Sequence, residues 1–426
     1  MKVLYCCTDP GIDLGGQGGG AIHIRASVRA LTRLGHPVTV VCSSVTDQTG
    51  VSKNLQALVR PAPLSRWNRG IVRLIQTGNR VAGRPIRQHP DLARALHNVS
   101  FARVAGAAIR QAKPDFIYER YSLWSRAGLT LAKRYRIPLV LEVNAPLVYE
   151  QKKYRSLCLP SVAARMERTI WRNADLLIAV SGPLRNYLEC EGIPGDRIVV
   201  LPNGVEPDRF LLDEERAAER LRLKVAGRYV IGMVATFKPW HGTDVLLAAF
   251  ELLHRSDPLT HLLLVGDGPL RAQLEERVRI AGLREAVTFT GTVPHRDVPR
   301  HIIAMDVAVV PYPEIEQNYY SPLKLFEYMA AGRPIVASRM GQVADILVAG
   351  ETGLLFDPGN VTELSDCLRR VQQSADLGLE LGRRAREACR LYTWDNNAAR
   401  LIEHVRALVG RGCNSMLLHK EEQSVV

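Results

Sequence analysis

Residues 229–268 read YVIGMVATFKPWHGTDVLLAAFELLHRSDPLTHLLLVGDG and contain a complete strand–helix–strand pattern. Two short apolar runs, 229–234 and 261–265, have the length and composition of buried strands. Between them, Thr243 or Asp244 stands where a helix is expected to begin. Two strands joined through a helix run parallel to each other. This stretch therefore predicts a parallel sheet covered by helices.

The same alternation extends in both directions along the chain. Further strands of the second half are expected at 287–290, 307–310 and 335–338. Strands of the first half are expected at 2–7, 38–42, 116–118, 139–143, 176–180 and 198–201. The turn sequence PNGVEP at 202–207 separates the two sets. We therefore predict an α/β protein with two doubly wound, Rossmann-like domains that face each other across a cleft.

The domain boundaries follow from these patterns. We place the first domain at 1–204 and the second at 205–393. An amphipathic helix at 394–411 is expected to cross back to the first domain, and the polar stretch 412–426 is expected to form a disordered tail. Ligands of doubly wound sheets bind beyond the carboxyl ends of the strands, so the loops that follow strands carry the most information.

Composition narrows the class of protein. The chain has 426 residues, of which 46% are hydrophobic and 23% are charged, as in ordinary globular proteins. The eight cysteines show no metal-ligand spacing, so we interpret them as reduced thiols of a cytoplasmic protein. Only five apolar residues precede Thr8, which is too short for a signal peptide, and no later run approaches the roughly 18 residues of a spanning helix.

The net charge of +13 is distributed unevenly. Residues 1–200 contain 29 Lys and Arg against 13 Asp and Glu, a net charge of +16, whereas residues 201–426 have a net charge of −3. An uneven distribution of charge along the chain indicates which partners a protein binds and does not determine its fold. It favours an anionic partner for the first domain.

A glycine-rich loop follows the first predicted strand. Residues 9–20 read DPGIDLGGQGGG and open a helix. Glycines allow the backbone to approach a ligand closely, and a helix N-terminus offers free N–H groups to an anion. The loop matches neither a dinucleotide fingerprint nor a P-loop, because no acidic residue closes the second strand and no Gly-Lys-Ser/Thr follows. A flexible loop without a ligand is the alternative.

The most informative segment is 319–336, YYSPLKLFEYMAAGRPIV. Ser321 is a good N-cap, Pro322 is a good first helical residue, and Gly332 ends the helix. A cation such as Lys324 is unfavourable near a helix N-terminus unless an anion lies between them. Glu327 shares its helix face and can accept two hydroxyl hydrogen bonds, as from a ribose. A surface Lys–Glu pair on an amphipathic helix is the alternative.

Two further loops in the second half also follow strands. Residues 235–242, ATFKPWHG, contain Lys238 and His241 as candidate phosphate contacts, although single Lys and His residues are more often solvated surface groups. The turns at 266–269 and 291–294 are required by chain geometry, so a ligand role is a secondary interpretation for them.

The second half resembles the nucleotide-sugar domain of retaining family 4 glycosyltransferases, which have the two-domain GT-B fold. The matching stretches are LLLVGDGPLR, FTGTVPHRDVP, MDVAVVPYP, SPLKLFEYMAAGRPIVAS and GETGLLFDPG. The first half resembles the family more loosely, through the glycine-rich loop, ALTRLGHPVTVV, PDFIYERYSLW and VLEVNAPLVYEQ. The resemblance covers nearly the whole chain. It implies the GT-B fold and the use of a nucleotide-diphosphate sugar.

The resemblance also implies roles for single residues. The family has two glutamates with seven residues between them. Glu327 matches the second, which holds the ribose, whereas the first position is occupied by Tyr319. In the loop after the first strand of this domain, Thr236 and His241 stand where the family has an Arg and a Lys, and Lys238 is expected to restore one positive charge and a protonated His241 another. In the first domain the family often places a His near the sugar, and Asn144 is the nearest equivalent.

We assign the expected site accordingly. The catalytic group comprises Lys238, Lys324, Glu327 and Asn144. The donor-binding group comprises Gly15, Gly16, Gly18, Gly19, Thr236, His241, Gly268, Val293, Tyr319, Ser321, Pro322 and Leu323. The acceptor side comprises Arg25, Glu142 and Glu150. No Asp-x-Asp motif is present, so no metal and no cofactor is expected to be required.

The resulting expectation is a retaining glycosyltransferase of polysaccharide, glycolipid or cell-envelope biosynthesis that uses a UDP- or GDP-sugar. A basic segment with apolar neighbours favours an anionic or lipid-linked acceptor and peripheral contact with the inner face of an anionic membrane. Its basic residues are Arg60, Arg66, Arg69, Arg73, Arg80, Arg84, Arg87 and Arg94. The alternatives are a solvated basic face, a nucleotide-sugar 2-epimerase and a non-catalytic nucleotide-sugar-binding subunit. No motif supports a nucleic-acid partner.

Overall fold

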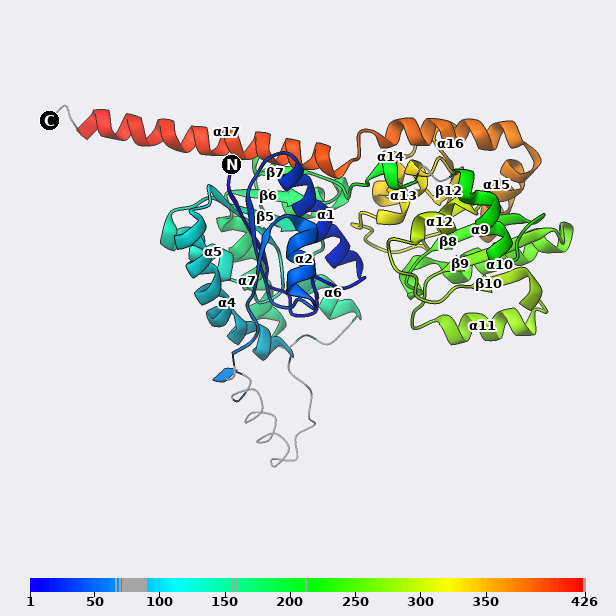
Figure 1. The fold of residues 1–426 in the computed structure, drawn as a ribbon, viewed down its shortest axis with the longest axis horizontal. Coiled ribbons are helices and arrows are strands. Elements are labelled where there is room, and N and C mark those ends of the chain that lie inside the picture. The colour runs from blue at the N-terminus through cyan, green and yellow to red at the C-terminus, as the bar shows by residue number, and fades with distance from the viewer. Residues whose placement is uncertain are drawn as a thin grey trace. The chain divides into compact units, whose positions relative to one another are not determined.

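The computed structural model describes residues 1–65, 67–68, 70, 90–154, 157, 159–210 and 213–423, which form two compact units (Figure 1). The first unit comprises residues 1–180, 184–202 and 395 onward. The second comprises Ser181–Pro183 and Asn203–Trp394. The chain thus passes from the first unit to the second at Pro202 and returns at Asp395.

The first unit contains a seven-stranded parallel sheet in the order β3-β2-β1-β4-β5-β6-β7. Its strands are β1 (Val3–Cys7), β2 (Val38–Cys42), β3 (Leu58–Pro61), β4 (Phe116–Arg120), β5 (Leu139–Val143), β6 (Leu176–Ala179) and β7 (Ile198–Val200). Its connecting helices are α1 (Gly19–Arg33), α2 (Gln48–Leu55), α4 (Pro90–Ala112), α5 (Ala127–Tyr135), α6 (Leu147–Tyr154), α7 (Pro160–Asn173) and α8 (Gly182–Cys190).

The second unit contains a six-stranded parallel sheet in the order β10-β9-β8-β11-β12-β13. Its strands are β8 (Tyr229–Val234), β9 (Thr260–Val265), β10 (Val287–Phe289), β11 (Val307–Val310), β12 (Ile335–Ser338) and β13 (Leu354–Phe356). Its helices are α9 (Arg216–Arg222), α10 (Thr243–Ser256), α11 (Arg271–Ile280), α12 (Val298–Ile303), α13 (Leu323–Ala330), α14 (Gly341–Ile346), α15 (Val361–Gln373) and α16 (Ala375–Cys389). Two Rossmann-like α/β units confirm the predicted fold class.

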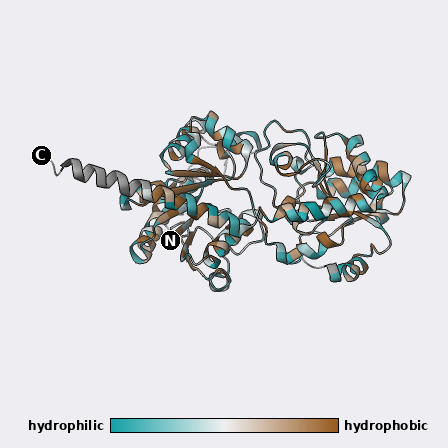
Figure 2. Cartoon of the chain, turned by 90° about the horizontal axis from the view of Figure 1, so that it is seen from above, coloured by the Kyte–Doolittle hydropathy of each residue, from teal (hydrophilic) through white to brown (hydrophobic). Residues whose placement is uncertain are grey.

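Both faces of the second sheet are buried, which explains why its strands are apolar throughout. Leu263 and Val265 of β9 belong to one core cluster, whereas the alternate residues Leu262 and Leu264 belong to another. Helices α12, α13 and α14 supply the first cluster, and α10, α11 and α15 supply the second. Figure 2 shows the apolar strands between helices whose outer faces are hydrophilic. Successive side chains of a strand point to opposite faces, so a doubly covered sheet needs apolar residues at every position.

Two strands were not predicted from the sequence. Both β3 (Leu58–Pro61) and β13 (Leu354–Phe356) are short and lie at sheet edges. Leu58 is 49% exposed, and the strand ends in a proline. Edge strands of this kind lack the long apolar run that marks a central strand.

The last helix, α17 (Trp394–Gln423), packs on the first unit. Asp395 is 2.7 Å from Arg33 of α1, and Asn397 donates to the carbonyl of Pro202. The structure continues this helix to Gln423, whereas the sequence-based expectation ended it at residue 411 and left a disordered tail. Gly410 and Gly412 favour an end near residue 411, but residues 413–423 contain neither proline nor glycine to prevent the helix from continuing. Among the described residues, no helix combines the length and the apolar character needed to span a membrane.

Candidate functional site

The strand order of the second sheet brings two loops together. The order reverses between β8 and β11, so the loop after β8 and the segment after β11 leave adjacent strand ends in the same direction. Gly242, in the first loop, has a φ of +69°, and a Cβ there would lie 1.6 Å from the carbonyl oxygen of Pro311 in the second. Only glycine fits this close approach. The two segments with candidate phosphate contacts therefore meet at the switch point of the sheet.

Helix α13 begins one residue later than the sequence suggested. Its N-cap is Pro322 and its first residue is Leu323, and no side chain caps it. The Ser321 hydroxyl is unavailable because it accepts a 2.8 Å hydrogen bond from the backbone N–H of Asn203. The prediction of Ser321 as the N-cap was wrong, because the competing partner lies 118 residues away in sequence. The first N–H groups of α13 remain open to an anion.

Lys324 is a buried cation at this helix start. The residue is 9% exposed, and its Nζ has no hydrogen-bond partner among the described residues. It lies 5.9 Å from the centroid of the Tyr312 ring. Burial lowers the pKa of Lys324 to about 7, and the nearby Glu327 carboxylate opposes that shift only in part. A buried ammonium without a partner is costly, so burial destabilises the charged form of Lys324.

His241 is a neutral neighbour of this lysine. Its Nδ1 is within hydrogen-bond reach of the carbonyl of Thr236. Burial, the positive charge of Lys324 and that of Lys238 lower the pKa of His241 to about 3. A protonated His241 was one expectation from the sequence, and it is wrong for pH 7. Lys238 extends over the ring of Trp240 at 5.2 Å, and it is the basic residue of this loop that carries a positive charge.

Glu327 is held in place by a chain of polar contacts. Its Oε1 lies 2.8 Å from Nε2 of His295, and Arg209 lies 3.4 Å from Nδ1 of the same ring. Because a guanidinium only donates, Nδ1 is the acceptor and Nε2 carries the proton that is donated to Glu327. Arg209 in turn lies 3.7 Å from Glu206. His295 thus holds one carboxylate oxygen of Glu327 in place.

Three further residues of the second unit that were predicted to bind the donor lie in loops and have the following surroundings. Tyr319 is buried, at 2% exposure, and its ring packs against Tyr320 with centroids 4.6 Å apart. Val293 packs against the core cluster that contains α13. Gly268 contacts the loop after β8, because a Cβ there would lie 2.5 Å from the backbone nitrogen of Phe237. No carboxylate is present at the Tyr319 position.

In the first unit, the glycine-rich loop follows β1 at the corresponding switch point between β1 and β4. A Cβ on Gly15 would lie 2.4 Å from the Thr46 carbonyl oxygen, whereas one on Gly18 would meet open space. Gly18 is the N-cap of α1, which starts at Gly19 without a side-chain cap. Arg25 donates to the carbonyls of Leu14 and Gly16, each at 2.7 Å. Arg25 therefore holds the glycine-rich loop in place through these two hydrogen bonds to its backbone.

The expected acceptor carboxylate is engaged inside the protein. Glu142 is 2% exposed and lies 2.8 Å from His23 and 2.9 Å from Arg120. It also accepts hydrogen bonds from the Tyr118 hydroxyl and, at 2.6 Å, from the Asn144 amide. Burial alone raises the pKa of Glu142, but His23, Arg120 and the Asn144 amide lower it well below its ordinary value. Glu142 orients Asn144 and leaves the Asn144 carbonyl oxygen as an acceptor.

Sequence reasoning missed several polar residues of both sites. Asn203, Arg209 and His295 position α13, and His23 and Arg120 enclose Glu142. His295 lies in the loop after β10, and Asn203 and Arg120 lie in stretches that the sequence analysis quoted, so these three carried a positional signal. Glu150 lies in α6, partly buried. Among the described residues, no group of three His, Cys, Asp or Glu side chains is placed to hold a metal ion.

Two Rossmann-like units, the second with an open helix start beside a buried lysine, define the class of nucleotide-binding α/β proteins. Residues 17–209 match the model of the family described as Glycosyltransferase Family 4, and residues 228–374 match that of Glycosyl transferases group 1. The chain belongs to these GT-B glycosyltransferases.

Curated relatives agree with this membership. A GDP-mannose-dependent alpha-(1-6)-phosphatidylinositol monomannoside mannosyltransferase of Mycolicibacterium smegmatis is 30% identical over 250 residues, covering 57% of this chain and 65% of that protein. A 2-deoxystreptamine glucosyltransferase of Streptomyces kanamyceticus is 30% identical over 259 residues, covering 58% and 65%. The matched part of this chain therefore spans slightly less than two thirds of the length of these relatives.

Solved structures share the fold. HepE of Anabaena, crystallised in complex with UDP, superimposes with a TM-score of 0.71 at 18% identity, covering 96% of this chain and all of that one. Sucrose-phosphate synthase of Thermosynechococcus elongatus gives a TM-score of 0.72 at 21% identity, covering 96% and 99%. At these identities the similarity establishes architecture.

Proposed function

We propose that this chain transfers a sugar from a UDP- or GDP-sugar to a hydroxyl acceptor with retention of configuration at the sugar. The observation that carries the proposal is Lys324, a buried cation without a partner at an uncapped helix start. A diphosphate supplies the negative charge that both features lack. Glu327, held by His295, is then placed to accept hydrogen bonds from the ribose.

In the proposed reaction the bond between the sugar carbon and the diphosphate oxygen breaks, and the acceptor oxygen bonds to the same face of the sugar. Negative charge develops on the leaving diphosphate. Lys324, Lys238 and the N–H groups at the start of α13 stabilise that charge where it forms. The hydroxyl proton passes to the departing diphosphate. The side-chain N–H of Asn144 donates a hydrogen bond to Glu142. Its side-chain carbonyl oxygen accepts a hydrogen bond from a sugar hydroxyl.

The acceptor is proposed to be anionic or linked to a lipid phosphate, in polysaccharide, glycolipid or cell-envelope biosynthesis. The net charge of +16 in residues 1–200 supports this. We also propose that the protein makes peripheral contact with the inner face of an anionic membrane. Of the basic segment that motivated it, Arg66, Arg69, Arg73, Arg80, Arg84 and Arg87 lie outside the described residues.

The deciding experiment measures donor binding and turnover with a panel of nucleotide sugars. Glu327→Ala is expected to weaken donor binding by about ten- to a hundredfold, because a charged acceptor is lost. Lys324→Ala is expected to reduce turnover by about a hundredfold or more. Glu285→Ala removes an exposed carboxylate of the same unit and serves as the matched control. Unchanged kinetics in both site variants would refute the assignment.

A non-catalytic subunit that binds nucleotide sugars is the alternative that Tyr319 favours, because a buried aromatic replaces the carboxylate of the family pattern. Such a protein would bind the donor with the same sensitivity to Glu327→Ala. It would neither transfer the sugar nor hydrolyse the donor. Release of nucleoside diphosphate by the purified chain therefore separates the two functions.

A further inference from the structure

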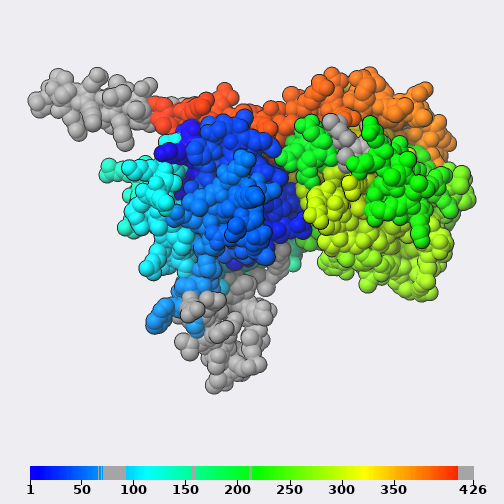
Figure 3. Space-filling model, in the orientation of Figure 1, coloured from blue at the N-terminus to red at the C-terminus, as the bar shows by residue number. Residues whose placement is uncertain are grey.

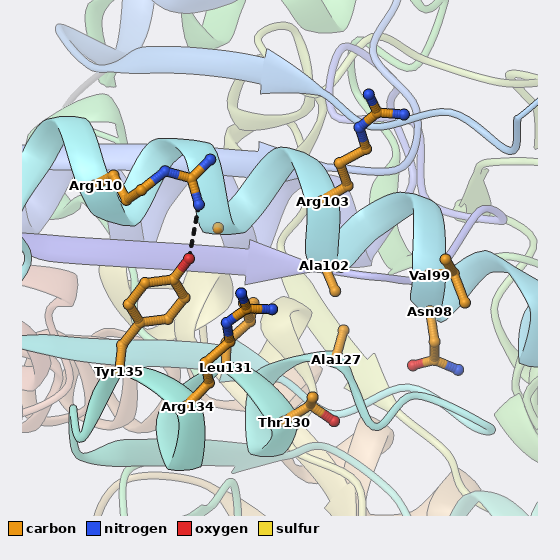
Figure 4. Close-up of a pocket in the computed structure, with 11 residues that line it drawn as sticks. Asn98, Val99, Ala102, Arg103, Arg110, Ala127, Thr130, Leu131, Arg134 and Tyr135 are labelled. Carbon is orange, nitrogen blue, oxygen red and sulfur yellow. Dashed lines mark hydrogen bonds between the residues drawn. The ribbon is translucent and has the colours of Figure 1, made fainter.

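A groove of about 480 Å³ runs between α4 and α5 of the first unit, on elements that no step of the proposed transfer uses. The residues that line it include the small or apolar Ala102, Gly106 and Leu131. Arg103 and Arg110 of α4 and Arg134 of α5 also line it, and Figure 4 shows the Arg110 side chain extending towards Tyr135 of α5. In Figure 3, part of these helices (cyan) forms an outer surface of the first unit. The volume is in the range of small-molecule sites.

The two sequence segments that line this groove contain basic residues and no acidic ones. Residues 92–114 and 120–141 contain nine Lys and Arg residues and no Asp or Glu. Elsewhere in the chain, exposed helical arginines have acidic neighbours one turn away, as in the pairs Arg279–Glu276 and Arg383–Glu380. None of the arginines of the groove forms an ion pair within the described part of the chain. A surface with cations alone is complementary to an anionic ligand.

The side chain of Tyr135 contacts two of the arginines that line the groove. Arg110 donates a 2.8 Å hydrogen bond to the Tyr135 hydroxyl, and the Arg134 guanidinium lies 5.8 Å from the centroid of the same ring. Gly106 leaves the room that this arrangement needs. A Cβ at that position would lie 3.2 Å from the Tyr135 hydroxyl and 3.8 Å from the Arg110 guanidinium. Two planar guanidinium groups with neighbouring N–H donors suit the oxygens of a phosphate.

We propose that this groove is an anion site that binds a phosphate group carried on a compact sugar or polyol. Arg110 and Arg134 contact the phosphate oxygens, and Arg103 adds charge at the rim. The apolar floor packs against the C–H groups of the neutral body. The same chemistry is offered by a soluble sugar phosphate and by the headgroup of a polyol phospholipid. The proposal does not rest on the proposed transferase activity.

The test uses the full chain with two probes. Binding of glucose 6-phosphate is measured by calorimetry, and binding to phosphatidylcholine vesicles with and without phosphatidylglycerol is measured by sedimentation. The double variant Arg110→Gln, Arg134→Gln is expected to weaken binding of the recognised probe by about tenfold or more, as expected for lost charge-assisted hydrogen bonds. Gly106→Leu fills the groove at constant charge and is expected to weaken it as well. The double variant Lys152→Gln, Arg165→Gln removes two exposed positive charges of α6 and α7, outside the groove, and is the control with the same loss of charge.

The two arms identify the source of the phosphate. Weakened calorimetric binding in the double variant assigns a soluble ester, whereas weakened sedimentation alone assigns the lipid headgroup. Lys324→Met separates this site from the proposed donor site. Glucose 6-phosphate binding that is lost in Lys324→Met and kept in the double variant would overturn the proposal. Equal affinity of the wild type, the double variant and Gly106→Leu for both probes would also overturn it.

Discussion

At the scale of single residues, Lys324 links protein stability to ligand binding. Its ammonium is buried without a hydrogen-bond partner among the described residues, and His241 beside it is neutral at pH 7. The free protein therefore favours an uncharged lysine, and a bound diphosphate would favour the charged form. The same residue that destabilises the empty protein would strengthen the complex.

This coupling predicts opposite pH effects on stability and binding. The folded pKa of Lys324 is about 7, whereas its ordinary value is 10.5, so the unfolded chain binds more protons between these values. The stability contribution of Lys324 should therefore rise with pH across this window, by at most about 1.4 kcal/mol per pH unit. Denaturant unfolding at several pH values measures it, with Lys324→Met as the control that lacks the slope.

The affinity for a nucleoside diphosphate should change with pH in the opposite direction to the stability. Because the diphosphate binds the protonated lysine, affinity for UDP or GDP should fall as pH rises above about 7, with uptake of a proton on binding. Calorimetry in buffers of different ionisation enthalpy measures the uptake. Proton uptake of the same size in Lys324→Met would show that another group is responsible.

At the scale of elements, the switch points of the two sheets select the functional loops. The sequence predicted both loops, because central strands of a doubly covered sheet have continuous apolar runs. The loop after β1 is rich in glycine, and the loop after β8 contains Pro239 and Gly242, which mark turns. It did not predict how α13 begins. The Ser321–Asn203 contact depends on a turn far away in sequence, and no local pattern reports it. The enclosure of Glu142 was missed for the same reason, since His23 and Arg120 come from other elements.

The glycine-rich loop offers a test with a built-in control. In Gly15→Ala the new methyl would lie 2.4 Å from the Thr46 carbonyl, so the loop must shift. The same substitution at Gly18 meets open space at a φ of −70°, which alanine accepts. If the loop contributes N–H groups to the leaving diphosphate, Gly15→Ala should reduce turnover by about tenfold or more, whereas Gly18→Ala should have a small effect. Equal activities of the two variants would argue against a role of the loop in the reaction.

At the scale of the whole molecule, charge and chain path both distinguish the two units. The surplus of positive charge belongs to the first, and within it residues 92–114 and 120–141 contain nine basic residues and no acidic one. The donor features belong to the second unit, whose half of the sequence has a net charge of −3. Apart from Ser181–Pro183, the second unit is one continuous segment, Asn203–Trp394, after which the chain returns through α17, so the first unit is built from both ends of the sequence.

This path predicts that α17 stabilises the first unit specifically. Leu401, Ile402 and Val405 are 2%, 3% and 0% exposed, and the helix is tied to Arg33 and Pro202 of the same unit. Leu401→Ala should lower the free energy of unfolding by about 2–4 kcal/mol through loss of apolar burial and formation of a cavity. Glu403→Ala, on the exposed face of the same helix, should have little effect.

Hydrogen exchange identifies which unit is affected. Amides of β1, β4 and β5 should exchange faster in Leu401→Ala, because that sheet loses part of the cover that α17 provides. Amides of β8, β9 and β11 should keep their protection, since their cores are built from residues of the second unit alone. Faster exchange of equal size in both sheets would mean that the units unfold together. The C-terminal helix would then stabilise the whole chain, and its contacts with the first unit would not explain its effect.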